Sequence, residues 1–364
     1  MSKNEQNYVK EAFDSNWIAP AGPHIKLFED KLSEISDNLN IAVLSSGTAA
    51  IHLALILLEV ERDDCVICSS FTFSASVNPV IYQGAHPIFI DSEKDTWNMD
   101  PVLLEQAIAE KLNQNQKPKA IILVHLYGYP AKLDEILRIA KKYDIPIIED
   151  AAEAIGSSYN NKPLGTFGDI GIYSFNGNKI ITTSSGGAIL SKDNNIIKKA
   201  KFLATQARED YPHYEHSEIG YNYRMSNVCA AIGVGQLEVL KDRVKKRRYI
   251  HDYYKQHLSN LKEINFLEEL PGFYSNRWLT TIIISEKSVI KREDIRLNLL
   301  KENIESRPLW KPMHLQPVFR KYQAYDNKVS EDLFNRGLCL PSGSNMEIED
   351  LERVINNIKS LYEK

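Results

Sequence analysis

The sequence predicts an α/β protein, with a large domain built on a mostly parallel sheet flanked by helices and a smaller α+β C-terminal domain. Short apolar runs rich in β-branched residues alternate with helical patterns over the first two thirds of the chain, as in βαβ units. The pattern changes near residue 245, after which one strand signal and two helix signals predict a compact α+β unit. A length of 364 residues suits two domains. We expect the large domain at 1–240 and the small domain at 241–364.

The spacing of apolar residues predicts the first elements of the chain. Ile25, Phe28, Leu32 and Ile35 recur at helical intervals. The segment 41–60 then predicts a short apolar strand, a Ser-Ser-Gly-Thr turn and an apolar helix. A strand that leads through small residues into a helix N-terminus can bind an anion, because unpaired N–H groups and the positive dipole end converge there. A tight connection without a ligand explains the same pattern equally well.

The alternation continues with predicted strands around 63–71, 117–128 and 145–156 and with an amphipathic helix at 132–144. Three polar residues, His125, Asp150 and Glu153, lie at the ends of these strands, where ligands of parallel sheets gather. Two of them have a simpler explanation too. His125 can satisfy hydrogen bonds at a strand end, and Glu153 can be a helix-start carboxylate that interacts with the dipole.

The second half begins with a predicted strand at 186–192, a long polar stretch at 205–227 and one helical run at 228–258. Within that run Lys245, Lys246, Arg247 and Arg248 form a charge cluster that we expect on a solvated helix face. A strand at 275–285 and helices at 290–303 and 348–364 complete the predicted C-terminal domain.

The composition excludes several classes of protein. A formal net charge of -4 gives no basic excess for nucleic-acid binding. No run approaches the ~20 apolar residues that span a bilayer, and the first residues lack a signal-peptide core, so we expect a cytoplasmic protein without a membrane partner. Cys65 and Cys68 form a CxxC within a predicted buried strand, and without a second such pair we expect structural thiols and no metal site.

Lys179 stands out in the stretch SFNGNKIITTSSGG, residues 174–187. Most lysines are solvated charges. Here Asn and Gly residues precede the lysine and β-branched residues follow it, which favours a close backbone approach and a desolvated, nucleophilic amine. An amine of this kind can form a Schiff base with a carbonyl compound, and pyridoxal phosphate is the cofactor that uses such chemistry.

The needs of pyridoxal phosphate can be matched along the chain. The cofactor requires donors for its phosphate, a stacking partner for its ring, a carboxylate for its pyridine nitrogen and a lysine for its aldehyde. The candidates are Gly47, Thr48, Ala49 and Ser174 for the phosphate, Phe73 for stacking, Asp150 for the pyridine nitrogen and Lys179 for the aldehyde.

Several motifs resemble a known family. The segments SSGTAAIHLAL, SSFTFSASVNPV, HLYG, IEDAAEAIGS, GTFGDIGIYSFNGNKIITTSSGGAI and GYNYRMSN are similar to those of the DegT/DnrJ/StrS sugar aminotransferases, which are fold-type I pyridoxal phosphate enzymes. The resemblance covers nearly the whole chain. The segments TQARE, HYEH, SNRWLTT, ESRPLWKPMH and LCLPSG most resemble the family branch that aminates UDP-2-acetamido-4-keto-2,6-dideoxyglucose in the UDP-N-acetylbacillosamine pathway.

The resemblance implies roles for individual residues. Lys179 would form the Schiff base, Asp150 would pair with the pyridine nitrogen, Phe73 would stack on the ring and Glu153 would lie near its O3′ side. Thr48, Ala49 and Ser174 would hold the phosphate. Family members are homodimers with shared active sites, so Asn222 should reach the phosphate in the neighbouring subunit. The implied reaction is a ping-pong transfer from glutamate to the 4-ketone of a nucleotide sugar.

Four residues are candidates for the substrate side. Arg208 and Arg307 suit a diphosphate or a carboxylate because the guanidinium binds bidentately, although surface ion pairs explain them equally well. Trp310 can stack on a base or a sugar, and His314 completes the group. Ser185 departs from the family, which usually has Gly or Glu there. If that position requires positive φ, serine would be strained.

Other functions remain open at this point. One is a GDP-perosamine synthase or another synthase of nucleotide-linked 4-amino sugars. A second is a pyridoxal-dependent sugar dehydratase on the same fold, against which Lys179 argues because such dehydratases carry histidine at that position. A third is a noncatalytic protein that binds pyridoxal phosphate or a sugar nucleotide.

Overall fold

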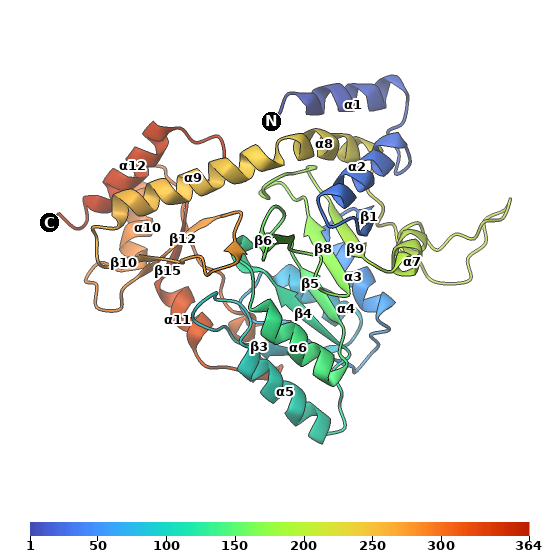
Figure 1. Cartoon of the computed structure of the whole chain (residues 1–364), viewed down its shortest axis with the longest axis horizontal. Helices are drawn as coiled ribbons and strands as arrows, with labels where there is room; N and C mark the ends of the chain where they lie inside the picture. Colours follow the sequence, from blue (N-terminus) through green and yellow to red (C-terminus); the bar gives the residue numbers. More distant parts are fainter. Residues whose placement is uncertain (364) are drawn as a thin grey trace.

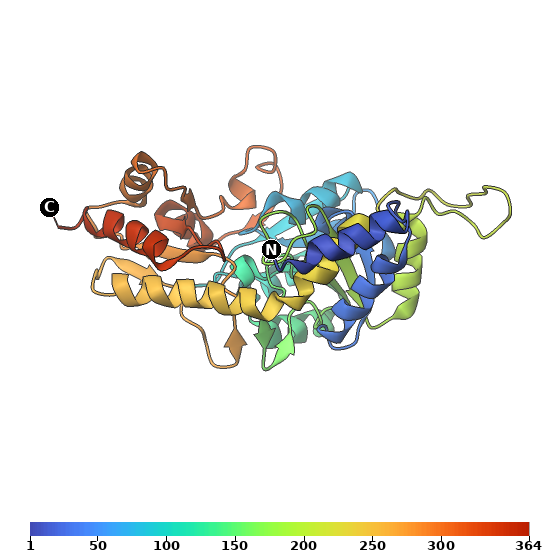
Figure 2. The same cartoon turned by 90° about the horizontal axis from the view of Figure 1, so that it is seen from above.

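A computed structural model describes residues 1–363, and it shows two regions side by side (Figure 1). One contains an eight-stranded sheet between helices, and the other a four-stranded sheet with its own helices. The long helix α9 (Leu240–Leu258) runs from the first region into the second (Figure 2). No helix in residues 1–363 has the length and apolar character needed to cross a lipid bilayer.

The eight-stranded sheet is mostly parallel, as the sequence predicts. Its order is β1-β9-β8-β5-β4-β2-β3-β14, and only β9 runs antiparallel to its neighbours. The strands are β1 (Asn40–Leu44), β2 (Cys65–Ser69), β3 (His86–Ile90), β4 (Ala120–Val124), β5 (Ile147–Asp150), β8 (Ile170–Ser174), β9 (Gly187–Ser191) and β14 (Ala324–Tyr325).

The strands of this sheet other than the edge strand β14, whose Ala324 is exposed, bury both faces, which explains their nearly continuous apolar sequences. In β4, Ile121 and Leu123 enter one core while Ala120 and Ile122 enter the other. The first core includes α2 (Pro23–Glu34), α5 (Pro101–Asn113), α6 (Leu133–Tyr143) and α8 (Asn227–Glu238), and Figure 1 shows α5 and α6 in front of the sheet. The second core includes α3 (Gly47–Leu57), α4 (Asn78–Tyr82) and α7 (Asn194–Ala204).

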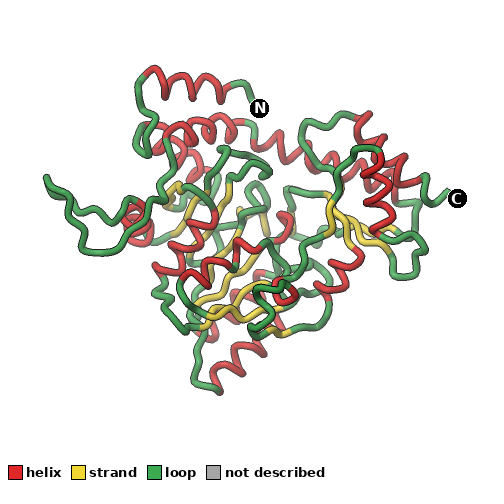
Figure 3. The backbone as a smooth tube through the Cα atoms, turned by 180° about the vertical axis from the view of Figure 1, so that it is seen from behind, coloured by secondary structure: helices red, strands yellow, loops and turns green. Residues whose placement is uncertain are grey.

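The second region is an antiparallel sheet of order β10-β12-β15-β13 (Figure 3). Its strands are β10 (Ile264–Phe266), β12 (Thr280–Ile284), β13 (Arg307–Pro308) and β15 (Gly337–Leu340), and its helices are α10 (Arg292–Lys301), α11 (Val329–Arg336) and α12 (Ile348–Lys359). The boundary at residue 240 stays a prediction. The chain returns to the large sheet at β14, which pairs in parallel with β3.

Most predicted elements are present with shorter bounds. The helical run 228–258 is an exception, because it divides at Val239 into α8 and α9. The polar stretch 205–226 forms a loop that projects from the body (Figures 1 and 2). The remaining elements are α1 (Asn4–Asp14), β6 (Ser158–Tyr159), β7 (Lys162–Pro163), β11 (Phe273–Tyr274) and the 3-10 turns η1 (Ser74–Ser76), η2 (Leu126–Gly128) and η3 (Met313–Leu315).

Candidate active site

The carboxyl ends of β1, β5 and β8 meet at one edge of the large sheet, and a cavity of about 250 Å³ lies there. Eight of the residues selected from the sequence line it: Gly47, Thr48, Phe73, Asp150, Glu153, Ser174, Lys179 and Trp310. The structure therefore brings together residues from widely separated parts of the chain.

One end of the cavity is built to bind an anion. Ser46 caps α3, and its Oγ accepts a 3.0 Å hydrogen bond from the Ala49 N–H. The N–H groups of Gly47 and Thr48 belong to the first turn, so they have no partner within the helix and lie at the positive end of its dipole. Ser174 closes this end at the end of β8. A Cβ atom on Gly47 would lie 3.1 Å from the Ser174 Cβ, so glycine permits this close approach.

Ala49 does not line the cavity in the way expected of a phosphate-binding residue. It is buried but does not line the cavity, and its N–H is already bound to Ser46. The first turn of α3 thus offers Gly47 and Thr48 to a ligand, while Ala49 stabilises the cap itself.

Asp150 lies at the end of β5 and is 3% exposed. Its Oδ2 accepts a 2.7 Å hydrogen bond from Ser76 Oγ, and its Oδ1 accepts a 3.1 Å bond from the Ala152 N–H. No basic side chain within residues 1–363 forms an ion pair with it. A buried carboxylate without a cation is costly, and a protonated pyridine nitrogen would supply the missing charge.

Lys179 reaches into the same cavity from the loop after β8. Its Nζ lies 3.8 Å from Glu153 Oε1 and 4.3 Å from the centroid of the Trp278 ring. The indole Nε1 of Trp278 donates a 2.9 Å hydrogen bond to the carbonyl oxygen of Asn178, directly before the lysine. Trp278 and Ser76 are site residues that the sequence interpretation missed. Trp278 falls within a predicted strand, and no motif marks its contact with a distant loop.

Glu153 lies in a turn and begins no helix, so its explanation as a helix-start carboxylate is wrong. Its Oε2 accepts a 2.7 Å hydrogen bond from the Tyr127 N–H. Burial raises the pKa of the Glu153 carboxyl, while Lys179 and the Tyr127 N–H act in the opposite direction. The Glu153 carboxyl therefore lies in a buried position beside the Lys179 amine, 3.8 Å from its Nζ.

His125 forms buried hydrogen bonds at the end of β4. Its Nδ1 accepts a 3.1 Å hydrogen bond from the Ala131 N–H, so Nε2 carries the proton and faces Glu149 Oε1 at 2.9 Å. Both side chains are fully buried. Glu149 also accepts hydrogen bonds from the N–H groups of Gly165, Phe167 and Gly168. The pair fixes the loop before β8 on the side of β5 opposite Asp150, which supports the explanation of His125 as a strand-end hydrogen-bonding residue.

Aromatic rings form the open side of the cavity. Phe73 is 53% exposed, and its ring centroid lies 5.4 Å from that of Trp310. Trp310 stacks in turn on Tyr127 at 6.0 Å. Phe73 is thus available to cover a flat ligand, as the sequence interpretation expects.

Four candidates lie outside this cavity. Asn222 is exposed in the loop before α8, and Arg208 is exposed on the projecting loop, where its guanidinium lies over the Tyr214 ring. Arg307 is exposed and paired with Glu305. The Nδ1 of His314 lies 2.6 Å from Ser70 Oγ, and its buried Nε2 has no hydrogen-bond partner in the described chain.

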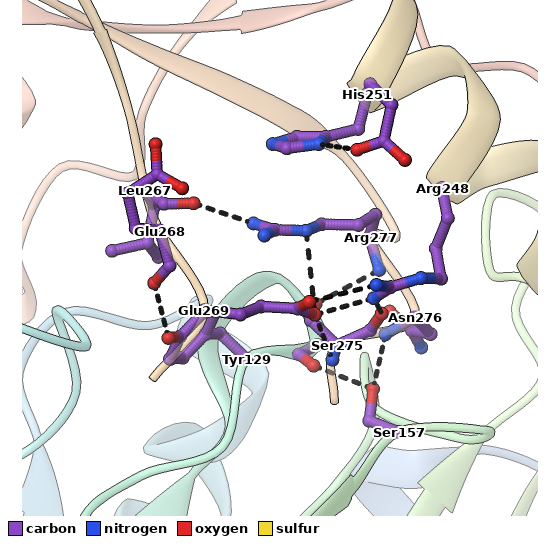
Figure 4. Close-up of polar contacts among 12 residues, drawn as sticks. Tyr129, Ser157, Arg248, His251, Leu267, Glu268, Glu269, Ser275, Asn276 and Arg277 are labelled. Carbon is purple, nitrogen blue, oxygen red and sulfur yellow. Dashed lines mark hydrogen bonds and ion pairs between the residues drawn. The ribbon is translucent and has the colours of Figure 1, made fainter. Parts of the chain in front are cut away.

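One expectation about the charge cluster needs correction. The cluster 245–248 is not a uniformly solvated face, because Arg247 is 8% exposed and Arg248 forms a bidentate pair with Glu269 (Figure 4).

Ser185 does not have the positive φ that would strain a serine at this position. The residue with positive φ is Ser184, at 72°, and Ser185 Oγ donates a 2.8 Å hydrogen bond to the Ser45 carbonyl oxygen.

The cavity combines a lysine, a buried carboxylate, an anion cradle and an exposed aromatic ring. These residues fit pyridoxal phosphate, since each functional group of the cofactor would find a side chain or N–H group of matching chemistry in the cavity. Together with the mostly parallel sheet, they define a pyridoxal phosphate-dependent enzyme.

The comparisons with known proteins identify its family. The model of the DegT/DnrJ/EryC1/StrS aminotransferase family matches residues 1–359, and the chain belongs to this family. It is 53% identical to EpsN of Bacillus subtilis (strain 168), which carries the name of a pyridoxal phosphate-dependent aminotransferase, over 100% of this chain and 94% of EpsN. It is 38% identical to the GDP-perosamine synthase of Escherichia coli O157:H7, over 100% of this chain and 96% of that protein.

Solved structures agree. A DegT DnrJ EryC1 StrS aminotransferase from Brucella abortus superposes with a TM-score of 0.92 at 29% identity, covering 100% of this chain and 96% of that one. The PLP form of Spr1654 from Streptococcus pneumoniae gives 0.91 at 28% identity, covering 100% and 97%. The family resemblance is confirmed, and the protein is a pyridoxal phosphate-dependent sugar aminotransferase.

Proposed function

We propose that the protein transfers the amino group of glutamate to C4 of a nucleotide-linked 4-keto-6-deoxy sugar. The most specific form of the proposal has UDP-2-acetamido-4-keto-2,6-dideoxyglucose as acceptor, for bacterial glycan or glycoprotein synthesis. The observation that carries it is the convergence of Lys179, Asp150 and Glu153 on one cavity. The proposal keeps a homodimer with shared active sites, as the family resemblance implies, and a cytoplasmic location, as the composition of the sequence led us to expect.

The proposed division of labour follows from the contacts. Pyridoxal phosphate, when bound, supplies an electrophilic carbon and an electron-withdrawing ring. Lys179 Nζ would take a proton from the donor Cα and later return one to the acceptor carbon. Asp150 would hold the pyridine nitrogen in its protonated form, and Ser76 keeps the carboxylate oriented by its 2.7 Å hydrogen bond.

The remaining residues bind and orient. Gly47, Thr48 and Ser174 would hold the phosphate, and Phe73 would cover the ring. Trp278 and Trp310 narrow the cavity around Lys179 and limit the access of water. Arg208, Arg307 and His314 would contact the substrate, and Asn222 would serve the neighbouring subunit.

Two candidate acceptor substrates differ in their nucleotide and in their sugar. The relative at 38% identity named GDP-perosamine synthase favours a GDP-linked acceptor without an acetamido group. The segments named above from TQARE to LCLPSG favour the UDP-linked acetamido sugar.

The experiment that tests the proposal supplies glutamate and a panel of UDP-, GDP- and dTDP-linked 4-keto-6-deoxy sugars. Mass spectrometry would follow replacement of the keto oxygen by an amine, and 2-oxoglutarate would be measured in parallel. Amination of the UDP-linked acetamido sugar in preference to the others supports the specific proposal. Preference for the GDP-linked sugar supports the second candidate, and no amination of any member contradicts both.

A further inference from the structure

A second and larger cavity adjoins the candidate active site. It measures about 670 Å³, and both cavities are lined by Asn178, Trp278 and Trp310. Its other walls come from α9, from the segment 303–308 and from the segment 339–354. The two tryptophans therefore lie between the Lys179 site and this second space, which we call the Arg247 cavity.

Arg247 is the buried cation of this cavity. It is 8% exposed, and its guanidinium makes one hydrogen bond within the described residues, a 2.8 Å contact from Nη1 to the carbonyl oxygen of Trp278. It forms no ion pair there, and its Nε is buried without a partner. The neighbouring Arg248 differs, because Glu269 binds it with two hydrogen bonds of 2.6 and 2.9 Å.

A buried guanidinium without a carboxylate is unfavourable, since removing the charge from water carries a desolvation penalty that no anionic partner offsets. Burial, together with the positive charge of Arg243, lowers the pKa of Arg247 to about 10, so the side chain is still charged at neutral pH. An anion that enters from solvent is the physical complement of this site.

A neutral donor lies in the same walls. Ser306 Oγ is buried without a hydrogen-bond partner in residues 1–363. The cavity also contains two carboxylates. Glu305 pairs with Arg307, and Asp350 accepts a 3.0 Å hydrogen bond from the Glu347 N–H. Neither carboxylate contacts the Arg247 guanidinium within residues 1–363. The cavity thus combines an unsatisfied donor with a buried positive charge.

We propose that the Arg247 cavity is an oxyanion subsite that binds the charged group of a substrate whose reacting carbon lies at Lys179. The oxyanion is the distal carboxylate of a dicarboxylic amino donor or the diphosphate of a sugar nucleotide. This inference rests on the proposed function. Trp278 connects the two sites, because its ring lies 4.3 Å from Lys179 Nζ while its carbonyl oxygen accepts from Arg247.

The test measures binding without turnover. The pyridoxal phosphate-loaded protein is reduced with borohydride, and isothermal titration calorimetry gives the Kd of glutarate, UDP and GDP. The variants are Arg247→Gln and Ser306→Ala, and the second leaves the contact between Arg247 and Trp278 intact. The matched control is Arg243→Gln, one turn earlier on α9, whose guanidinium contacts Ser344 and lines neither cavity.

We expect Arg247→Gln to raise the Kd of at least one probe about tenfold or more, and Ser306→Ala to raise the Kd of the same probe about threefold. The Arg243→Gln control should bind the probes with a Kd near that of wild type. If only glutarate binds more weakly, the subsite binds the carboxylate of the amino donor. If only a nucleotide binds more weakly, the subsite binds the diphosphate of the sugar nucleotide. If both bind more weakly, the two substrates share the subsite. If Arg247→Gln does not fold, Ser306→Ala decides alone by the same criterion.

The inference is overturned if wild type binds none of the three probes, or if the folded variants bind all of them with wild-type affinity. The absorption band of the lysine-bound cofactor is recorded before reduction. A normal band with unchanged probe binding rejects the subsite and leaves the proposed function standing, whereas an absent band contradicts the proposed function itself.

Discussion

The Lys179 ammonium nitrogen lies 4.3 Å from the centre of the Trp278 ring, and the same tryptophan donates a 2.9 Å hydrogen bond to the carbonyl oxygen of Asn178. One side chain from the segment before β12 therefore supports both the backbone and the amine of the candidate Schiff-base residue. Trp278 is 2% exposed, so neither contact competes with bulk water.

Substitution of Trp278 should separate these two contacts. Trp278→Phe keeps an aromatic face but loses the hydrogen bond, and we expect the half-reaction with glutamate to slow about fivefold. Trp278→Leu loses both contacts, and we expect a decrease on the order of 50-fold. Stopped-flow absorbance gives the rates, and the rate of cofactor band formation provides a second readout. Equal rates in the leucine variant and wild type would refute this positioning role.

The carboxylate of Asp150 should matter more than its hydrogen-bond partner. Asp150→Asn removes the negative charge that would hold the pyridine nitrogen protonated, and we expect the half-reaction to slow roughly 10²-fold or more. Ser76→Ala removes one 2.7 Å hydrogen bond and should cost roughly 3- to 10-fold. Single-turnover spectra with glutamate measure both. A serine variant slower than the asparagine variant would not fit this account.

The anion cradle depends on a glycine. In Gly47→Ala the new Cβ would lie 3.1 Å from the Ser174 Cβ, which should push α3 away from β8 and weaken cofactor binding about tenfold. The matched control is Gly177→Ala, because a Cβ at Gly177 meets no atom within 4 Å. Equilibrium dialysis with pyridoxal phosphate gives both dissociation constants. Similar values for the two variants would argue against a close-packed cradle.

Stability should fall in mild acid because of His251. Burial, with the positive charge of Arg277, lowers the pKa of His251 to about 4 from the ordinary 6.5 (Figure 4). The folded state then binds fewer protons than the unfolded chain between these values, so this stabilisation is present above pH 6.5 and is lost as the pH falls toward 4. From pH 7 to pH 5 the loss is about 2 kcal/mol.

Urea unfolding of wild type and His251→Gln at both pH values checks this prediction. The variant should lose about 2 kcal/mol less free energy of unfolding on acidification than wild type does. Parallel decreases in the two proteins would assign the acid sensitivity to other groups.

Local pattern predicted the sheet, the turn before α3 and the positions of Asp150, Ser174 and Lys179, because each depends on short-range spacing and on the general geometry of parallel sheets. The contacts of Trp278 and Arg247 could not be predicted in this way. Trp278 reaches Lys179 from about 100 positions along the chain. Arg247 belongs to a charge run that resembles a solvated face, and only the packing of α9 against the segment around Trp278 buries it.

The central claim is that Lys179 binds the cofactor covalently, and it can be tested at the level of one atom. The loaded protein is reduced with borohydride, digested and analysed by mass spectrometry, beside a Lys179→Ala variant. We predict a pyridoxyl group on the wild-type peptide that contains Lys179. The corresponding peptide of the Lys179→Ala variant should carry no pyridoxyl group. A pyridoxyl group on another lysine at full occupancy, or none in wild type, would contradict the account.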